Sequence, residues 1–368
     1  MVPVQHATDD SSDELGKSLS PCLPLIVFQH HQSYQHENEH GMLMFSVSEK
    51  RLLPHAADMA PDLVAAGSNM FWTSPQGWML VIKSTMSPSS SAAWLWNPRT
   101  GDKITLPDVE RDDDGGGLDI PMDSKCLLTR KDATHPECFV VLFDRRQPNM
   151  WYCKVVVDDD GRRRSWRRYT YDIGDNEVPS KDDPPSSPPT KDVISSIAAV
   201  RGELFFISSH EDMCAISFAS ASDDPEFQYF DAAMVDFPEG MSSGITWLVE
   251  SEDELFLVCI CFVGFDAGNI GAIHVYRMDF STEAWRRVHN IGDAVMLLED
   301  TNMAASCPAS PLGLKPNQIY LMNNFVADDA DLCIFDVELE MQEITRVHQR
   351  DDLILYRKPF WILPPYYY

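Results

Sequence analysis

Residues 251–288 have the sequence SEDELFLVCICFVGFDAGNIGAIHVYRMDFSTEAWRRV, in which apolar runs alternate with short polar turns. The run over residues 255–265 is rich in Val, Ile, Phe and Cys, which favours a strand buried on both faces. It is too short for a membrane span, which needs about 18 or more apolar residues. A glycine-containing loop leads to a second strand at residues 273–278, and a polar turn leads to a third that carries Trp285 and Val288. Three strands joined by short turns make most of one β-propeller blade.

The same pattern recurs along the chain as an apolar strand, a turn of Asn, Asp or Ser, and a second strand. The turns lie roughly 50–60 residues apart, close to the range of repeat architectures, near Ser48, Asn97, Asp158, Ser220, Asp279 and Asp336. A further apolar strand precedes each later hairpin, over residues 77–82, 138–143, 202–207, 253–258 and 317–322. We therefore predict an all-β propeller of four-stranded blades. Six hairpins give six blades as the simplest count, or seven if the first unit is compressed.

Four further segments fit the innermost and closing positions of such a ring. Residues 194–200 and 245–249 are rich in small and branched side chains, which suit the crowded strand beside the central channel. The first apolar strand, at residues 23–29, and the last, at 354–363, are placed to share one blade. Closure of that kind removes the open sheet edges that invite aggregation.

The chain divides into a short leader and one domain. Residues 1–20 are polar and acidic, and we expect a disordered leader, followed by a single propeller domain over residues 21–365. Low-complexity loops interrupt the domain near residues 110–118 and 178–192. A helix over residues 51–66 is disfavoured because two prolines interrupt the segment.

Composition limits the classes of partner. The formal net charge is −28, from 57 acidic and 29 basic residues, so the surface repels phosphate backbones and we expect no nucleic-acid binding. The amino terminus is neither a signal peptide nor an Arg-rich transit peptide, so we expect a protein of the cytoplasm or nucleus, with no membrane association. The nine cysteines form no CxxC pair and lie mostly in apolar runs, as expected of buried free thiols.

Four histidines near the amino terminus, His30, His31, His36 and His40, raise the question of a metal site. They lack the helical i, i+4 frame and any neighbouring cysteine, so we expect an exposed loop without metal. The Cys259-x-Cys261 pair lies in one apolar run, and alternation places both thiols on one face of a buried strand. We expect a structural role for this pair too.

Two other motifs have alternative interpretations. The segment at residues 240–244 matches GxSxG, the nucleophile elbow of hydrolases, with Ser242 as nucleophile. An elbow needs a strand before it and a helix after it, but a strand-like run follows Ser242, so we expect an inter-blade turn. The run at residues 161–169, GRRRSWRRY, is either a basic partner patch or a set of arginines paired with residues 158–160 and with other acidic blades. We favour the pairing.

Several segments together resemble the plant KIB-type β-propeller family, whose members often follow an F-box. The resemblance is carried by GWMLVI at residues 77–82, LWNPRTGDKITLP at 95–107 and VYRMDFSTEAWRRVHNIGDAVMLL at 275–298. The segments SCPASPLGLKPNQIYLMNN at 306–324 and IFDVE at 334–338 follow in the same order. The resemblance implies a propeller that captures a protein for ubiquitination while an F-box docks a Skp-type adaptor.

Function follows from the resemblance rather than from any catalytic motif. We expect a non-catalytic protein-recognition module with no cofactor, no metal and no catalytic residue, acting as a monomer on a protein partner. The residues that bind this partner stay unassigned. Because about 20 polar residues precede the propeller, we expect no F-box and no binding of a Skp-type adaptor. The alternative is a propeller hydrolase or lyase with its active site at the channel mouth.

Overall fold

The computed structural model describes most of the chain, with gaps. The described residues are Leu19, 22–31, 40–53, 69–83, 90–110, 120–156, 165–176, 190–218, 224–264, 269–299, 303–323, 330–348 and 358–365. Most of the expected leader and low-complexity loops lies outside these residues. So do all but three residues of the proline-interrupted segment at 51–66.

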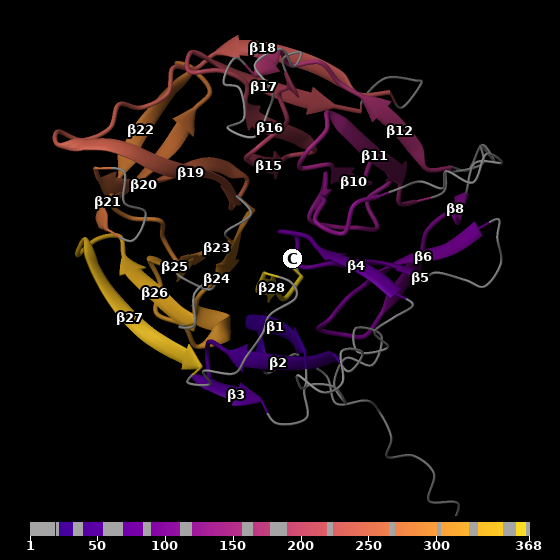
Figure 1. Cartoon of the computed structure of the whole chain (residues 1–368), viewed down its shortest axis with the longest axis horizontal. Helices are drawn as coiled ribbons and strands as arrows, with labels where there is room; N and C mark the ends of the chain where they lie inside the picture. Colours follow the sequence, from indigo (N-terminus) through magenta and orange to yellow (C-terminus); the bar gives the residue numbers. More distant parts are fainter. Residues whose placement is uncertain are drawn as a thin grey trace, which may run out of the picture.

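Six blades, antiparallel apart from one parallel pair in blade 6, form a ring around a central axis (Figure 1). The strands of each blade are named below from the innermost to the outermost. Blade 1 consists of β28 (Phe360–Ile362), β1 (Leu25–His31), β2 (His40–Ser46) and β3 (Arg51–Leu53). Blade 2 consists of β4 (Asn69–Thr73), β5 (Met79–Lys83), β6 (Ser90–Trp96) and β7 (Lys103–Thr105), with β8 (Val109–Glu110) also paired to β6. Blade 3 consists of β9 (Lys125–Leu128), β10 (Phe139–Phe143), β11 (Asn149–Lys154) and β12 (Arg167–Thr170).

The other three blades complete the ring. Blade 4 consists of β15 (Ile197–Val200), β16 (Glu203–Ile207), β17 (Asp212–Ser217) and β18 (Glu226–Asp231). Blade 5 consists of β19 (Met241–Ser251), β20 (Glu254–Val263), β21 (Ile270–Asp279) and β22 (Ala284–Val288). Blade 6 consists of β24 (Ala304–Pro308), β23 (Ala294–Leu298), β25 (Gln318–Asn323), β26 (Ala330–Asp336) and β27 (Met341–His348). The prediction of six blades is confirmed.

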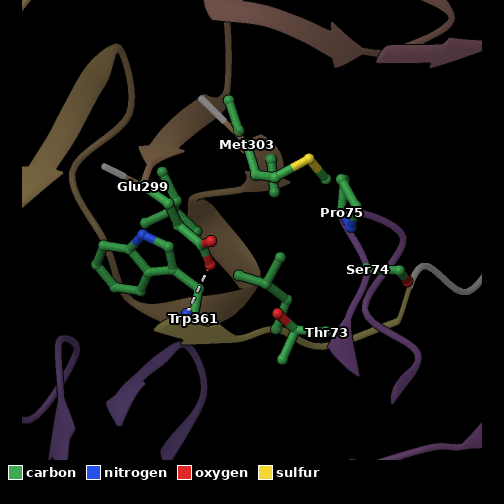
Figure 2. A pocket seen from close by; sticks show the side chains of 10 residues that line it. Thr73, Ser74, Pro75, Glu299, Met303 and Trp361 are labelled. Atoms are coloured by element: carbon green, nitrogen blue, oxygen red, sulfur yellow. Dashed lines mark hydrogen bonds between the residues drawn. The ribbon is translucent and has the colours of Figure 1, made fainter. Parts of the chain in front are cut away.

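The ring closes in blade 1 through the last strand. β28 pairs antiparallel with β1, and Trp361 lies opposite Ile26. The Trp361 indole Nε1 donates to the carbonyl of Leu298 at 3.2 Å. Its backbone N–H donates to Glu299 Oε1 at 3.0 Å, as Figure 2 shows. These bonds join blade 1 to blade 6. The predicted sharing of one blade by the first and last strands is confirmed, with a closing strand shorter than the predicted 354–363.

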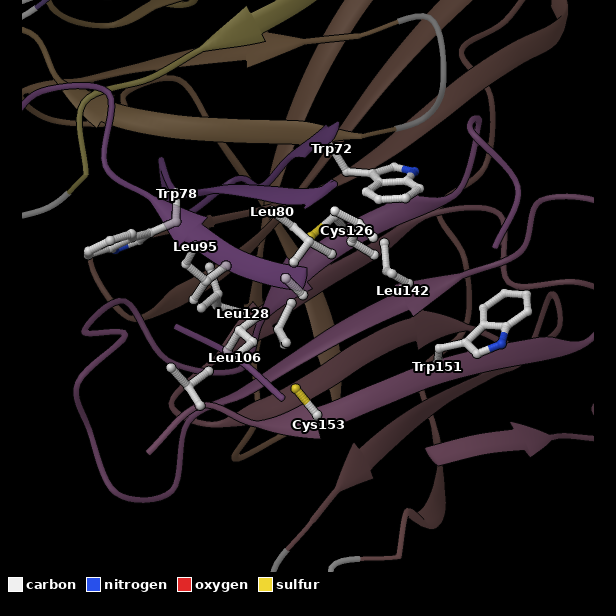
Figure 3. Packing of buried hydrophobic residues seen from close by; sticks show 14 of the residues in the cluster. Trp72, Trp78, Leu80, Leu95, Leu106, Cys126, Leu128, Leu142, Trp151 and Cys153 are labelled. Carbon is white, nitrogen blue, oxygen red and sulfur yellow. The ribbon is translucent and has the colours of Figure 1, made fainter. Parts of the chain in front are cut away.

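Among the described residues the hydrophobic core forms six clusters, one at each interface between neighbouring blades. Figure 3 shows the cluster between blades 2 and 3, where Trp72 and Leu80 meet Cys126 and Leu142. Both faces of each sheet are therefore covered, which explains why β10 and β20 have continuous apolar sequences rather than alternating ones. Burial on both sides of every blade holds the ring as one rigid scaffold.

Four strands are additional to the predicted four-stranded units. β23 pairs antiparallel with β24 and parallel with β25, so it is inserted between the innermost and second strands of blade 6. β8 extends blade 2, and β13 (Asp175–Asn176) pairs with β14 (Thr190–Lys191) outside the blades. Among the described residues no helix has the length and apolar character needed to cross a membrane.

Candidate functional site at the channel mouth

A cavity of about 250 Å³ opens where the turns between innermost and second strands gather at one end of the channel. Four consecutive blades, 2 to 5, line it with ten residues. They are Gln76, Thr129, Arg130, Lys131, Asp132, His135, Ala199, Arg201, Gly202 and Asp253. Seven of these ten side chains are charged or can donate and accept hydrogen bonds, in addition to the amide of Gln76. The channel mouth is thus a polar site supplied by turns that lie far apart in the sequence.

The β9–β10 connection supplies half of this lining and is held by its own hydrogen bonds. Asp132 Oδ1 accepts from the backbone N–H of Thr134 at 2.8 Å and from its hydroxyl at 2.6 Å. His135 Nδ1 accepts from the N–H of Glu137 at 3.1 Å. An Asp side chain bonded two residues ahead is an Asx turn, which fixes the backbone locally. Because Nδ1 of His135 acts as acceptor, its Nε2 carries the proton of the neutral ring.

Arg130 lies flat against the β15–β16 turn of the next blade. Gly202 has φ +100, and a Cβ atom there would lie 2.4 Å from the Arg130 Cζ. Glycine therefore satisfies both the left-handed backbone and the space that the guanidinium occupies. Arg130 Nη2 donates to Glu137 Oε2 at 2.9 Å, while its Nε is buried and has no hydrogen-bond acceptor among the described residues.

A buried ion pair joins two blades that are not neighbours in the ring. Lys131 of blade 3 places Nζ 2.9 Å from Glu250 Oε1 and 3.4 Å from Asp253 Oδ1, both in blade 5. The Lys131 and Glu250 side chains are only 11% and 8% exposed. Burial raises the pKa of Glu250 and the Lys131 ammonium opposes that rise. The pair therefore holds the mouth together across blade 4.

The β19–β20 turn that carries these carboxylates has an unusual backbone. Glu252 and Asp253 have φ values of 51° and 62°, the geometry of a type I′ hairpin turn without glycine. Glu250 Oε1 accepts from the N–H of Asp253 at 2.7 Å, which compensates part of the strain. The same carboxylate thus shapes the turn and pairs with Lys131.

A second, much smaller cavity of about 20 Å³ lies beside the closing strand (Figure 2). Met303, Trp361 and Leu363 make much of its wall apolar, and Glu299 is bonded to the Trp361 backbone. The Ser74 Oγ is buried there without a partner among the described residues. The volume suits one water molecule rather than a ligand.

Gly240-Met241-Ser242-Ser243-Gly244, the hydrolase-like motif, lies at the start of β19. Only Gly240, with φ +84, lies in the turn, so the expectation of a turn over the whole motif was wrong. The strand begins earlier because Met241 and Ser243 pair with the end of β20, across a register irregularity. A strand follows Ser242, not the helix that a nucleophile elbow requires.

We expect Ser242→Ala to leave the melting temperature and any measured activity unchanged. Exposure of the wild-type chain to a fluorophosphonate probe, followed by peptide mass spectrometry, checks this directly. Covalent labelling of Ser242 would contradict the expectation and favour the hydrolase alternative.

Three of the four histidines and both cysteines singled out in the sequence occupy strands. His30 and His31 end β1 and His40 begins β2, with His31 and His40 opposite each other, so the exposed loop expected for these three was wrong. The apolar pairing of β1 with β2 simply extends further than the sequence indicated, while His36 lies outside the described residues. Within the described part of the chain no group of three or more metal-ligating side chains converges.

All nine cysteines are buried and free. Cys259 and Cys261 pack in the same cluster between blades 4 and 5, on one face of β20 as predicted. Burial raises the pKa of both thiols. Inert, protonated thiols are therefore expected there.

The described part of the arginine run pairs with its surroundings. Arg167 Nη1 lies 3.2 Å from Asp224 Oδ1 of the next blade, and the Arg168 guanidinium lies 5.7 Å from the Trp151 ring centre. The predicted pairing with a neighbouring blade is confirmed for Arg167. Residues 158–160 and 161–164 lie outside the described residues.

Sequence reasoning missed a buried lysine in the innermost strand of blade 3. Lys125 is 4% exposed, and its Nζ donates to the carbonyl of Ile194 at 3.4 Å. Burial, with a smaller contribution from Arg145, lowers the pKa of Lys125 to about 7. The KCLL sequence of β9 signals a strand, but nothing in it signals that the lysine faces inward.

This lysine predicts a pH dependence of stability. The folded-state pKa lies below the ordinary value, so the unfolded chain binds more protons between about pH 7 and pH 10.5, and stability rises with pH through that window. Lys125→Met removes the titrating group and with it this pH dependence. We expect the variant to be more stable than wild type at pH 7, by on the order of 2 kcal/mol, with the gap narrowing towards pH 10. Urea unfolding of both proteins across this range measures the gap, and a gap independent of pH would contradict the prediction.

Comparison with known proteins defines the class to which this ring belongs. The family model described as KIB1-4 beta-propeller matches residues 26–336. The chain therefore belongs to the KIB1-4 β-propeller family, which confirms the resemblance noted in its sequence. No curated protein matches the chain.

Solved structures match the chain at low identity. Apo AztD from Citrobacter koseri is 6% identical with a TM-score of 0.32, covering 92% of this chain and 96% of that one. The uncharacterized protein lmo1340 from Listeria monocytogenes EGD-e is 11% identical with a TM-score of 0.30, covering 89% and 92%. The polysaccharide lyase Uly1 is 7% identical with a TM-score of 0.29, covering 74% and 79%. Likeness at this level carries no functional argument.

Proposed function

We propose that this propeller is a non-catalytic protein-recognition module that binds its partner at the end of the ring where the 250 Å³ cavity opens. The observation that carries the proposal is the construction of that end. Turns from four blades converge on one polar cavity, and the packed blade interfaces hold those turns in place. Rigid scaffolds that present variable turns are well suited to recognition.

The side chains around the cavity support binding rather than catalysis. Thr129 is the only hydroxyl among the described lining residues, and it accepts from the Phe139 N–H at 3.0 Å rather than pairing with His135. Glu250 and Asp253 are paired with Lys131. The cavity thus lacks, among described residues, the nucleophile and base within hydrogen-bond reach that a hydrolase needs. A lyase using His135 as base is the remaining enzymatic alternative, tested by His135→Ala on any activity found.

Hydrogen–deuterium exchange of the chain with an affinity-purified partner tests the proposal. We expect protection of backbone amides in the turns at residues 129–138, 199–203 and 250–254. The connections at residues 144–149 and 208–212, at the opposite ends of β10 and β16, serve as internal controls and keep their exchange rates. Protection confined to those control connections would contradict the proposal. Binding should also weaken with added salt, because the net charge of −28 makes part of the attraction electrostatic.

A further inference from the structure

The cationic side chains of the channel mouth are not distributed as the acidic composition of the chain suggests. Arg130, Lys131 and Arg201 all line one cavity, against the two carboxylates of Asp132 and Asp253. Lys131 is already paired with buried Glu250. The guanidinium groups of Arg130 and Arg201 are therefore the cations available to a ligand.

Arg130 has unused donor capacity that points to an acceptor. Its Nε is buried without a hydrogen-bond partner among the described residues, and a buried unsatisfied donor is costly unless a ligand or water fills the place. Its ion pair with Glu137 uses a carboxylate that is 68% exposed, and exposed pairs of this kind are weak. An incoming anion can replace Glu137 at little cost.

Arg201 also lines the cavity, from the β15–β16 turn. It has φ 52 and makes no ion pair with any residue that the structure describes. Gly202 beside it leaves room for the Arg130 guanidinium, so the two arginines face the cavity from adjacent blades. Planar guanidinium groups match the oxygens of carboxylate and phosphoryl groups in geometry and charge.

We propose that this cavity binds an oxyanion on a side chain of the partner protein, a carboxylate or a phosphoryl group, through Arg130 and Arg201. The volume of about 250 Å³ suits one such side chain rather than a large ligand. The long-range repulsion from the acidic surface is screened beyond about 8 Å at physiological salt, so the local cations govern the last step of binding. The inference rests on the proposed function for its partner, but the cavity itself is testable without one.

Isothermal titration of the full chain at physiological salt, where the acidic surface is screened, tests the proposal with blocked peptides Gly-Gly-X-Gly-Gly, where X is phosphoserine, glutamate, serine or arginine. We expect heat of binding for phosphoserine, glutamate or both, and none for serine or arginine. Phosphoserine and glutamate are the two arms that distinguish a phosphoryl from a carboxylate ligand. Binding of the arginine peptide alone, or of none of the four, would overturn the proposal.

Substitutions that are expected to change the peptide affinity in opposite directions then test whether the peptide binds in this cavity. Arg130→Gln and Arg201→Asn should each weaken binding of the anionic peptide about tenfold or more, because each removes a charge-assisted hydrogen bond. Asn tolerates the left-handed backbone at position 201. Asp132→Asn keeps an oxygen for the Asx turn and removes a negative charge, so it should strengthen binding. A weaker affinity in Asp132→Asn, or unchanged affinity in both arginine variants, would refute the site.

Arg146→Gln is the matched control. It removes the same charge from the connection between β10 and β11, at the opposite end of blade 3, where the Arg146 side chain is 79% exposed. We expect unchanged peptide affinity, and a loss equal to that of Arg201→Asn would indicate nonspecific charge effects and refute the site. The outcomes also separate the two proposals. If the peptides bind but the partner protects amides elsewhere, the anion-binding cavity stands and the proposed recognition face is refuted. If the partner protects the turns around the cavity but no peptide binds, the recognition face stands and the anion site is refuted.

Discussion

Replacing Lys131 by methionine is expected to lower the free energy of unfolding by about 3–5 kcal/mol at pH 7.5, because Glu250 is left as a buried carboxylate without its partner. The carboxyl group is 8% exposed and its pKa is already raised by burial. Without Lys131 that pKa rises further. A group whose folded-state pKa exceeds the unfolded value destabilises the fold as pH rises through this interval. The difference in free energy of unfolding between wild type and Lys131→Met should therefore be larger at pH 8 than at pH 5, as measured by urea unfolding.

Two variants serve as controls for this prediction. The double variant Lys131→Met with Glu250→Gln removes both charges and keeps an acceptor for the Asp253 N–H, so it should recover much of the lost stability. Arg146→Met breaks the exposed pair with Asp123 and should leave stability almost unchanged. If Lys131→Met unfolds like wild type at both pH values, the buried pair does not hold the channel mouth.

Trp361→Ala should cost about 3–5 kcal/mol, since it empties the interface between blades 1 and 6 at the strand that closes the ring. The side chain is 2% exposed and belongs to the cluster with Val295, Leu297 and Ile26. The substitution also removes the indole donor to Leu298. Thermal unfolding followed by circular dichroism measures the loss, and a melting temperature equal to that of wild type would contradict closure of the ring by β28.

A pair of Trp→Phe substitutions separates hydrogen bonding from packing. Trp361→Phe keeps an aromatic ring but leaves the Leu298 carbonyl without its donor, for a cost of about 1 kcal/mol beyond the smaller ring. Trp151 is equally buried, but its Nε1 has no hydrogen-bond acceptor among the described residues. Trp151→Phe should therefore cost less than Trp361→Phe. Equal losses would show that the indole hydrogen bond contributes nothing.

The hairpins were predictable because local chemistry encodes their turns. Asn97 Oδ1 accepts from the N–H groups of Arg99 and Thr100, and Asp336 Oδ1 accepts from Glu338 and Leu339. Each Asx side chain therefore directs its own reversal, whatever the rest of the chain does. Such positions, repeated at a regular spacing, predicted both the all-β class and the number of blades.

The arrangement of blade 6 could not be predicted in this way. β23 has the sequence AVMLL and is buried throughout, so it has no alternation from which to infer a partner. Its insertion between β24 and β25 leaves β24 as the innermost strand, next to β19 of blade 5. Tertiary packing determines that arrangement. Blade 6 therefore adds one strand, β23, to the predicted four-stranded unit.

The channel-mouth site was equally hidden. Lys131 and Glu250 are far apart in the sequence, and neither belongs to a motif with a fixed spacing. Only the circular arrangement of blades brings the β9–β10 connection to the β19–β20 turn. A sequence shows that these residues are charged, but their burial is decided by the whole ring.

Blade 1 combines strands that are far apart in the sequence, and this has a consequence for synthesis on the ribosome. Its three outer strands, β1 to β3, are synthesised before every other strand of the ring, whereas β28 is synthesised after all of them. At about 5–20 residues per second the edge of β1 stays unpaired for on the order of tens of seconds, while later blades form beside it. During that interval the nascent chain exposes an open edge and the apolar face of blade 1 that later packs against blade 6, and such surfaces are typical targets of chaperones. Pairing of β28 with β1, rather than formation of any single blade, is therefore the event that completes the native ring.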